Sequence, residues 1–332
     1  MQSVTLKHIG DNLGVSKRLV SYALNGTGRV GSATRLRILE EAARLGYRPN
    51  RAARALTTGR SGLIALCLSA RATIYGDELT RAIEEKVRLS GFDLIVSRMN
   101  DDFETNPDLL PRGLSQVDGA FLLEPPKLPS PVEKAILHNV VIVGVRHHDD
   151  PSDYDVVRVD LAPAAAEAAR AILRCKPRRF AYFTAYAWAS STESRMAAYL
   201  SAVDSIGQEP IFIRLPHHVQ LVEDAAAMFE TYVASNPVPD ALMCSNDEVA
   251  TGALRAIHKL GIRCPDEIVV TGCDGLFYTR DLHPPLSTIA QPFARMAELG
   301  WNMLERRLSN SDEPHRVHVV PAEFISRAST GG

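Results

Sequence analysis

Basic and polar side chains share one face of a short predicted helix near the start of the chain. Lys17, Arg18, Ser21 and Tyr22 lie one, three and four residues apart, the spacing of neighbours on a helix surface. Lysine and arginine pair with phosphate groups and with guanine edges in the major groove, and hydroxyl groups hold a nucleic-acid backbone in register. These residue types at this spacing indicate contact with a nucleic acid.

Three short helices are predicted to position these side chains, over residues 6–13, 17–24 and 32–45. Thr5 and Ser16 are N-cap residues for the first two, and Gly14 allows the tight turn between them. The residues expected to face inward from the third helix are Ile38, Leu39, Ala42 and Leu45. A second helix that presents donors after a tight turn is typical of a helix-turn-helix, and an arbitrary three-helix bundle is the alternative.

The charge distribution favours the helix-turn-helix. Residues 1–60 contain eleven lysines and arginines against three acidic residues, a net charge of +8. The whole chain has 37 basic and 39 acidic residues, so residues 61–332 carry a net charge of −10. A basic N-terminal region followed by an acidic remainder is typical of a chain whose first module binds a polyanion and whose other residues have a separate function.

From about residue 62 the chain alternates apolar strands with helices. Strands are predicted at 63–68, 92–96, 119–123 and 140–145, and then at 179–184, 211–215, 241–244 and 268–272. Helices are predicted at 77–90, 164–173, 193–206, 221–233, 247–260 and 295–308. Apolar strands joined by helices predict parallel sheets covered on both faces, and the series is long enough for two such lobes.

Polar residues near the strand ends are the candidate binding residues, because open α/β sheets bind ligands at the carboxyl ends of their strands. Ser69, Asn246, Asp247 and Asp274 stand at such positions, and Arg195 lies in the first turns of its helix. Forked arginine donors opposite fixed amide and carboxylate groups suit a hydroxylated ligand. The alternative is that Asn246 and Asp247 only cap the following helix and that Asp274 belongs to a turn.

Two stretches, VTLKHIGDNLGVSKRLVSYALNG at 4–26 and ARLGYRPNRAARALTTGRSGLIAL at 43–66, resemble the DNA-binding head and hinge of the LacI/GalR family of bacterial transcription regulators. The resemblance extends over nearly the whole chain. It implies an all-α helix-turn-helix head with a hinge helix, joined to a two-lobed α/β core with parallel sheets, like that of the periplasmic binding proteins. The implied function is a sequence-specific repressor of transcription, controlled by a sugar or related metabolite bound between the lobes.

The implied domains follow from the same resemblance. The head is expected at 1–49, the hinge helix and linker at 50–61, and the effector-binding and dimerisation core at 62–332. Within the core, lobe 1 is expected to cover about 62–160 plus 291–320, and lobe 2 about 161–290 plus 321–332.

In this family the hinge helix folds on DNA and places a leucine in the minor groove, where an apolar wedge unstacks a base step and bends the duplex. The resemblance assigns that role to Leu56, with Ala53 beside it, and burial of Leu56 in an ordinary helix is the alternative. The predicted DNA-binding residues are Thr5, Ser16, Lys17, Arg18, Ser21, Tyr22, Asn25, Tyr47, Asn50, Arg51, Ala53 and Leu56.

One departure from the family affects base recognition. At the last base-reading position of the second helix the family usually has arginine, whereas this chain has Tyr22. Arginine can contact guanine in a bidentate fork, and tyrosine cannot. We therefore expect a half-site that differs from the family's common one at that base pair, with Lys17 and Arg18 providing most of the direct readout.

Three segments of the core, SRMAAY, SNDEVATGALRA and GCDG, resemble effector-binding segments of the family, and Arg146 and Asp160 match positions that often face its cleft. After the first strand the family's D-x-x-N-P-F-F is replaced by residues 70–76, ARATIYG, in which only Tyr75 keeps an aromatic ring. This leaves an acidic, a phosphorylated or a non-sugar effector open. The predicted effector-binding residues are Ser69, Tyr75, Arg146, Asp160, Arg195, Asn246, Asp247 and Asp274.

No catalytic, cofactor or metal site is predicted. The GxGxxG pattern at 26–31 follows a helix and lacks the downstream acidic residue of a dinucleotide site, and the loop sequence His147–Asp150 has no partners to complete a metal site. The five scattered cysteines are expected to be free and mostly buried. Without an export signal or an apolar membrane-spanning stretch, a cytoplasmic protein with no membrane contact is expected.

The expected partners are double-stranded DNA with an inverted-repeat operator, a small-molecule effector and a second copy of the chain. A homodimer is favoured over a tetramer, and the helices at 77–89 and 295–308 are expected to offer apolar faces for it. A soluble binding protein and an α/β enzyme are the alternative functions. Both explain only the core, and neither accounts for Lys17, Arg18 and Leu56.

Overall fold

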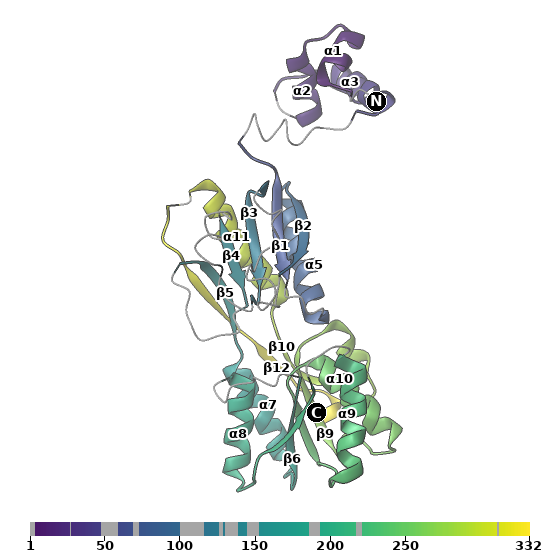
Figure 1. Ribbon diagram of the computed structural model, residues 1–332, viewed down its shortest axis with the longest axis vertical. Helices are drawn as coiled ribbons and strands as arrows, with labels where there is room; N and C mark the ends of the chain where they lie inside the picture. The colour runs from purple at the N-terminus through teal and green to yellow at the C-terminus, as the bar shows by residue number, and fades with distance from the viewer. Residues whose placement is uncertain are drawn as a thin grey trace. The chain divides into compact units, whose positions relative to one another are not determined.

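The computed structural model describes residues 4–26, 28–47, 59–68, 73–99, 116–125, 129, 139–144, 153–185, 193–216, 221–310 and 312–332. The chain divides into two compact units, Met1–Ser61 and Gly62–Gly332 (Figure 1). The described part of the first unit is helical. The second unit contains two β-sheets flanked by helices.

The first unit is a three-helix head in which α1 (Leu6–Leu13), α2 (Lys17–Asn25) and α3 (Ser32–Arg44) pack on one another. Its buried core consists of Ile9, Val20, Ala23, Ile38 and Ala42. Leu39, predicted to face inward, is 44% exposed. The helix rotates by roughly 100° between Ile38 and Leu39, and the small head covers only the side that carries Ile38 and Ala42.

Two caps and two glycines shape the start of α1 and the turn into α2. Thr5 and Ser16 cap these helices as predicted, since their side-chain oxygens accept the backbone N–H three residues on, at 3.4 and 3.2 Å. Gly14 has a φ of 66°, in the left-handed region that favours glycine. Gly10 permits a close approach, because a Cβ there would lie 2.6 Å from the carbonyl oxygen of Val15. The chain therefore turns directly against α1.

The first sheet of the core has the strand order β11–β5–β4–β3–β1–β2, and all its paired strands are parallel. Its strands are β1 (Leu63–Leu68), β2 (Asp93–Arg98), β3 (Gly119–Leu123), β4 (Val140–Val143), β5 (Asp155–Asp160) and β11 (Val317–Pro321). β5 and β11 were not predicted. Charged residues interrupt the apolar run in β5, so its sequence alone does not resemble a buried strand.

The second sheet has the order β12–β10–β9–β8–β6–β7, with β12 antiparallel to β10 and the other pairs parallel. Its strands are β6 (Phe180–Thr184), β7 (Ile211–Arg214), β8 (Ala241–Cys244), β9 (Val269–Asp274), β10 (Ser287–Ala290) and β12 (Glu323–Ile325). One 3-10 helix, η2 (Phe277–Asp281), lies between β9 and β10, and another, η3 (Ala328–Thr330), follows β12.

Lobe 1, the part of the core around the first sheet, covers one face of that sheet with α5 (Ile74–Leu89) and α11 (Phe293–Ser309) (Figure 1). Leu79 and Ile83 of α5 and Met303 and Leu304 of α11 are buried in the core of the chain itself. The prediction that these apolar faces serve a dimer is therefore wrong, because they are already covered within one chain.

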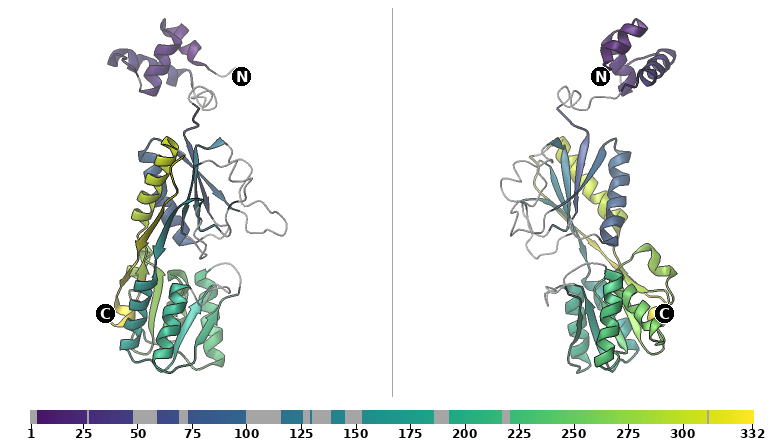
Figure 2. Two further views of the ribbon diagram at one scale, coloured as in Figure 1. Left: turned by 90° about the vertical axis from the view of Figure 1, so that its left-hand side faces the viewer. Right: turned by 45° about the vertical axis from the view of Figure 1, so that its right-hand side comes forward.

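Lobe 2, the part around the second sheet, has helices on both faces (Figure 2). One face packs against α7 (Ala162–Arg174) and α8 (Ser194–Ser205), and the other packs against α9 (Leu221–Ser235) and α10 (Asp247–Lys259). This burial on both sides explains why strands such as β8 are apolar along their whole length.

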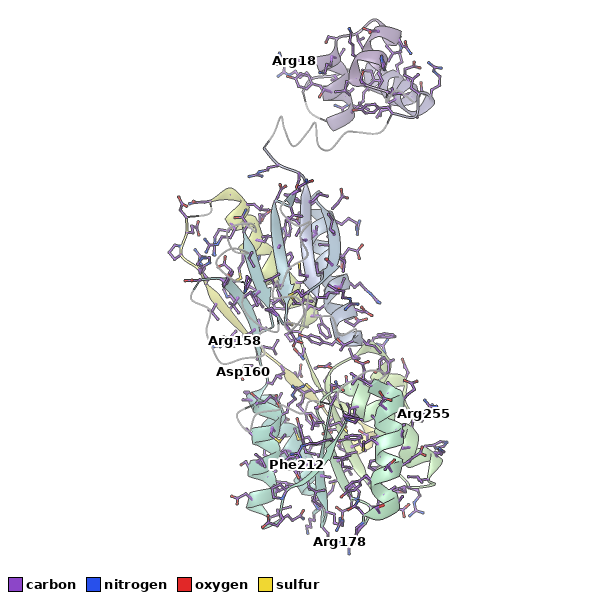
Figure 3. The ribbon with its side chains drawn as sticks, in the orientation of Figure 1. Arg18, Arg158, Asp160, Arg178, Phe212 and Arg255 are labelled. Carbon is purple, nitrogen blue, oxygen red and sulfur yellow. The ribbon has the colours of Figure 1, made fainter. Side chains whose placement is uncertain are left out.

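The carboxyl ends of the parallel strands of both sheets meet where the lobes join. The chain leaves lobe 1 at the carboxyl end of β5, where Asp160 lies at the junction between the lobes (Figure 3). It returns from the carboxyl end of β10 into α11. Because the strands that carry the candidate binding residues run parallel to β5 in the first sheet and to β10 in the second, their carboxyl ends face this junction from both lobes.

A buried carboxylate opens β5. Asp155 is 0% exposed and accepts hydrogen bonds from Arg306 Nη2 at 3.0 Å, from Arg307 Nε at 2.7 Å and from the backbone N–H of Arg316 at 2.8 Å. These bonds join the start of β5 to the end of α11 and to the residue before β11. A long-range ion pair therefore fixes one end of lobe 1.

The described cysteines are free, but they are not all buried. Cys67, Cys244 and Cys273 are buried as predicted, Cys264 is half-buried, and Cys175 is exposed at the end of α7. Among the described residues, no helix has the length and apolar character needed to span a membrane.

Candidate functional site

The exposed side of α2 presents the predicted donors of the head. Lys17 and Arg18 lie in its first turn and are exposed (Arg18 is labelled in Figure 3), while Val20 and Ala23 on the opposite side are buried. The helix is therefore anchored by its apolar side and carries two positive charges into solvent at its N-terminal turn. This is the end of a recognition helix that contacts base edges when such a helix lies in a major groove.

Tyr22 orients Arg18. Arg18 Nε donates a hydrogen bond to the Tyr22 hydroxyl at 2.7 Å, and the guanidinium carbon lies 5.3 Å from the centre of the ring. The ring also packs against Gly28, where a Cβ would lie 2.7 Å from a ring carbon. The departure from the family at Tyr22 therefore changes how a neighbouring base-reading candidate is held.

The remaining DNA-binding candidates of the head are placed differently. Thr5 and Ser16 are helix caps, and Tyr47 packs partly buried against the head core, where burial raises the pKa of its phenol. Ser21 lies half-buried on α2. Some candidates lie outside the described part of the chain. They are the side chain of Asn25 and the predicted hinge helix with Asn50, Arg51, Ala53 and Leu56.

In lobe 2, Arg195 is held rigidly at the start of α8. Glu193 caps this helix, accepting the N–H of Arg195 and of Met196 at 3.2 Å, and it also accepts from Arg195 Nε at 2.7 Å. Arg195 Nη1 donates to the carbonyl oxygen of Ser245, just after β8. Burial opposes the charge of Arg195, but the Glu193 carboxylate keeps the pKa of the guanidinium above its ordinary value.

Asn246 and Asp247 have different roles. Asn246 caps α10, its side chain accepting the backbone N–H three residues on at 2.8 Å, as the capping alternative stated. Asp247 is 0% exposed and accepts from the Leu276 N–H at 2.8 Å and the Thr288 hydroxyl at 2.6 Å. Gly272 leaves the space that its carboxylate occupies. Burial raises the pKa of Asp247 to about 6, although its hydrogen bonds oppose the shift.

Asp274 is a buried carboxylate on a strained backbone. It ends β9, is 5% exposed and has a φ of 129°, a conformation that residues other than glycine rarely adopt. Its Oδ1 accepts from Gln291 Nε2 at 3.0 Å. Burial raises the pKa of Asp274, Asp247 and Glu124 raise it further, and Arg195 lowers it. Backbone strain and shifted pKa values of this kind are common at functional sites.

Lobe 1 uses its predicted aromatic residue for packing. The Tyr75 ring is 8% exposed and lies 5.4 Å from the ring of Phe293, inside the lobe 1 core, so the expectation that it faces an effector is corrected. Thr73 caps α5 and accepts the Gly76 N–H at 3.1 Å. The helix therefore begins at Ile74, three residues earlier than its predicted start at 77.

The remaining effector-binding candidates of lobe 1 are Asp160, Ser69 and Arg146. Asp160 is exposed, and its Oδ1 accepts the N–H of Ala162 at 3.0 Å where the chain crosses between the lobes. This bond turns the chain into α7, which is a structural role. Ser69 and Arg146 lie outside the described residues.

One hydrogen bond joins α10 of lobe 2 to α5 of lobe 1. Glu248 Oε2 accepts the N–H of Ile74, the first residue of α5, at 3.2 Å. Burial raises the pKa of Glu248, and the neighbouring Asp77 and Asp247 raise it further. A carboxylate at a helix N-terminus is favourable, so this contact stabilises the approach of the two lobes.

Two family models match the chain. One describes bacterial regulatory proteins of the lacI family and matches residues 5–50, and the other describes a periplasmic binding protein-like domain and matches residues 161–330. The chain belongs to the LacI/GalR family of bacterial transcription regulators. The predicted family is thereby confirmed, and with it a DNA-binding head joined to an effector-binding core.

Relatives of this LacI/GalR regulator match along its whole length. The ribose operon repressor of Haemophilus influenzae is 26% identical over 98% of each chain, and the HTH-type transcriptional repressor PurR of Mannheimia succiniciproducens is 25% identical over 98% of each chain. A structure of the lac repressor dimer bound to operator and the anti-inducer ONPF is 22% identical over 99% of each chain, with a TM-score of 0.79. The last likeness confirms the predicted fold.

Four residues of this LacI/GalR regulator that the sequence did not single out interact with the candidates Arg195 or Asp274, namely Glu124, Tyr182, Glu193 and Gln291. Glu124 directly follows β3, so the strand-end rule that selected Asp274 also selects it. Glu193 was predicted only as a helix start. Gln291 follows β10, a strand that was not predicted, and Tyr182 lies in the middle of a strand, where no sequence pattern marks it.

Proposed function

We propose that this LacI/GalR regulator is a cytoplasmic repressor that binds an inverted-repeat operator as a homodimer. Binding of an effector would either lower or raise its affinity for that operator. The exposed pair Lys17 and Arg18 on a capped helix carries this proposal, because an isolated binding protein has no use for it. The lac repressor dimer, a relative in fold, is bound to operator in its structure. In our assignment the head covers 1–49, the hinge and linker 50–61, and the core 62–332.

We assign the effector to the strand ends where the lobes meet. Arg195 and Asp274 are the side chains best placed to contact it, because Arg195 is half-buried and Asp274 is buried at this edge, and neighbouring side chains hold both. Asn246 and Asp247 support the site, the first by starting α10 and the second by fixing the loop after β9. Ser69 and Arg146 stay predicted contacts from lobe 1.

Control of DNA binding would follow from the approach of the lobes. An effector that binds one lobe arrangement better shifts the protein toward it, and the shift cannot exceed the difference in affinity, typically about 1–3 kcal/mol. The contact between Glu248 and Ile74 is one that changes when the lobes separate. The lobe arrangement would in turn set the separation at which two hinge helices can order on an operator.

The first prediction concerns base recognition by Tyr22. Replacing Tyr22 with arginine supplies a bidentate guanine reader and removes the partner of Arg18, so we expect the preferred base pair at one half-site position to change, with a discrimination of about 1–3 kcal/mol. Selection from random DNA duplexes with full-length protein at near-physiological salt measures this. Adding a metabolite extract to a second arm shows whether the effector releases or recruits the protein.

The matched control is Arg263→Ala, which changes an exposed arginine of the core and should leave the selected sequence unchanged. Identical preferred sequences for wild type and Y22R would contradict the role of Tyr22. If wild-type protein enriched no inverted repeat at all, operator binding itself would fail, and the binding-protein alternative would explain the core better.

A further inference from the structure

The core begins at a residue whose backbone is held on both sides. Gly62 is the first residue of the second unit and directly precedes β1. Its carbonyl oxygen accepts the N–H of Asp93, the first residue of β2, at 3.0 Å, and its N–H donates to Asp118 Oδ2 at 2.8 Å. Asp118 directly precedes β3. Because β1 lies between β2 and β3, both of its neighbours hold the point where the linker joins the core.

Gly62 turns the chain as it enters the sheet. Its φ is 73°, in the left-handed region that favours glycine. In an extended strand the N–H and the C=O of one residue point to the same neighbouring strand, whereas those of Gly62 reach opposite neighbours. A Cβ at this position would meet nothing within 4 Å, so glycine is needed here for its backbone conformation. The bond to Asp118 therefore fixes the turn through which the linker continues into β1.

Asp118 is itself fixed by the strands beside it. Its N–H donates to the carbonyl oxygen of Leu63 at 2.8 Å, and its own carbonyl oxygen accepts from Asn139 Nδ2 at 2.9 Å. Asn139 directly precedes β4. The carboxylate that holds Gly62 is thus tied to the amino ends of β1, β3 and β4, and it moves with lobe 1.

Lobe 2 contains the same arrangement at a place where no linker enters. Asp240 directly precedes β8, the neighbour of β6, and its Oδ1 accepts the N–H of Arg178 at 3.1 Å and that of Arg179 at 2.9 Å, just before β6. The Asp240 N–H donates to the carbonyl oxygen of Arg179 at 3.1 Å, as that of Asp118 does to Leu63. The chain that enters β6 comes from α7 of the same lobe. The two aspartates therefore share a structural role, and only Asp118 also holds the junction with the head.

We propose that Asp118 is a positioning residue for operator binding, which fixes Gly62 and with it the direction from which the linker enters the core. This inference rests on the proposed function, since it concerns how the hinge of that function is held. Fixing the backbone of one residue costs conformational entropy, and most of all for glycine. Because the bond to Asp118 already fixes Gly62 in the free protein, the ordering of the hinge on an operator does not include this cost.

Operator binding should depend on this bond, and general DNA binding should not. The head binds the phosphates of any duplex through its positive charges, which needs no ordered linker. Two half-sites require two heads at a set separation, so each linker must end at a fixed position on its core. A loss confined to the operator therefore indicates positioning, since a smaller fraction of folded protein would weaken binding to both kinds of duplex.

The test compares Asp118→Ala with Asp240→Ala in the full-length protein. Affinities for the selected operator and for a random duplex of the same length are measured at one salt concentration, and urea unfolding measures stability. We expect Asp118→Ala to bind the operator about tenfold more weakly, which corresponds to the ordering of about one residue, and to bind the random duplex as wild type does. Asp240→Ala removes the equivalent bonds of lobe 2, and it should bind both duplexes as wild type does.

Two further variants separate the bond from the fold. Asp118→Asn keeps a side-chain oxygen that can accept the Gly62 N–H, so it should recover most of the operator affinity. Gly62→Ala keeps Asp118 but disfavours the left-handed turn, so it should weaken operator binding even if Asp118→Ala does not fold.

Unchanged operator affinity in Gly62→Ala, or in a folded Asp118→Ala, would overturn the inference. An equal loss in Asp240→Ala would also overturn it, because the bond would then matter only for the stability of the core. A wild-type protein that did not distinguish the operator from the random duplex would contradict the proposed function itself.

Discussion

Replacing Asp155 with alanine is expected to lower the free energy of unfolding of the core by about 3–5 kcal/mol. The side chain is 0% exposed, and its oxygens accept from Arg306, from Arg307 and from the backbone N–H of Arg316. Arg307 is only 4% exposed. Truncating the acid leaves a buried guanidinium without its main counter-charge, and the cost of that unpaired charge exceeds the value of the bonds themselves.

Urea unfolding of the full-length protein measures this loss. Trp301 is a suitable fluorescent reporter, because it is buried on α11 and its ring lies 5.6 Å from that of Phe92 in lobe 1. The control is Asp266→Ala, which removes an exposed partner of Arg263 and should cost no more than about 1 kcal/mol. A loss for Asp155→Ala as small as that of the control would show that the buried pair does not hold lobe 1 together.

The sequence did not identify Asp155, and the reason is physical. Its arginine partners lie about 150 residues away in the chain, and no local periodicity records a contact of that length. The same limit explains the missed strands. β5 is interrupted by charges, and β11 (VHVVP) contains a histidine and a proline and is mostly exposed. Only their pairing with each other and with β4 makes them strands. The helices and apolar strands were predicted because each has its own periodicity or apolar run.

The candidate site was predicted in part for similar reasons. Strand-end position is a local property, and it correctly indicated Asn246, Asp247 and Asp274 as residues at the edge of the sheet. Whether a polar residue there caps a helix, fixes a loop or faces a ligand depends on groups from other elements. Tyr75 shows the limit most clearly, because its role in packing depends on Phe293, more than 200 residues away.

Replacing Asp247 with asparagine is expected to stabilise the core increasingly as pH rises from about 4 to about 6. Burial raises the pKa of Asp247 from 3.8 to about 6 in the folded chain, so the folded state favours the protonated acid. The stability contributed by this shift is fully present below the unfolded pKa and is lost as pH rises through the folded one. A shift of about two units corresponds to roughly 3 kcal/mol.

Asparagine resembles the protonated acid at every pH. Its amide oxygen can accept from the Leu276 N–H, as Asp247 does now. Its amide nitrogen can donate to the Thr288 hydroxyl, which reverses the direction of the bond that Asp247 now accepts from that hydroxyl. It also removes a charge that acts on Asp274. Urea unfolding of wild type and Asp247→Asn at several pH values gives the difference directly, and it should grow in favour of asparagine up to about pH 6 and then level off.

Asp247→Ala separates this electrostatic effect from the role of the hydrogen bonds. Alanine removes the charge and also both bonds, which leaves the buried N–H of Leu276 without an acceptor, so we expect it to destabilise the core throughout the pH range. If asparagine proved as destabilising as alanine at pH 7, the carboxylate would be required in its charged form. Asp247 would then contribute charge to the effector site, and its support of the loop after β9 would be the lesser of its two roles.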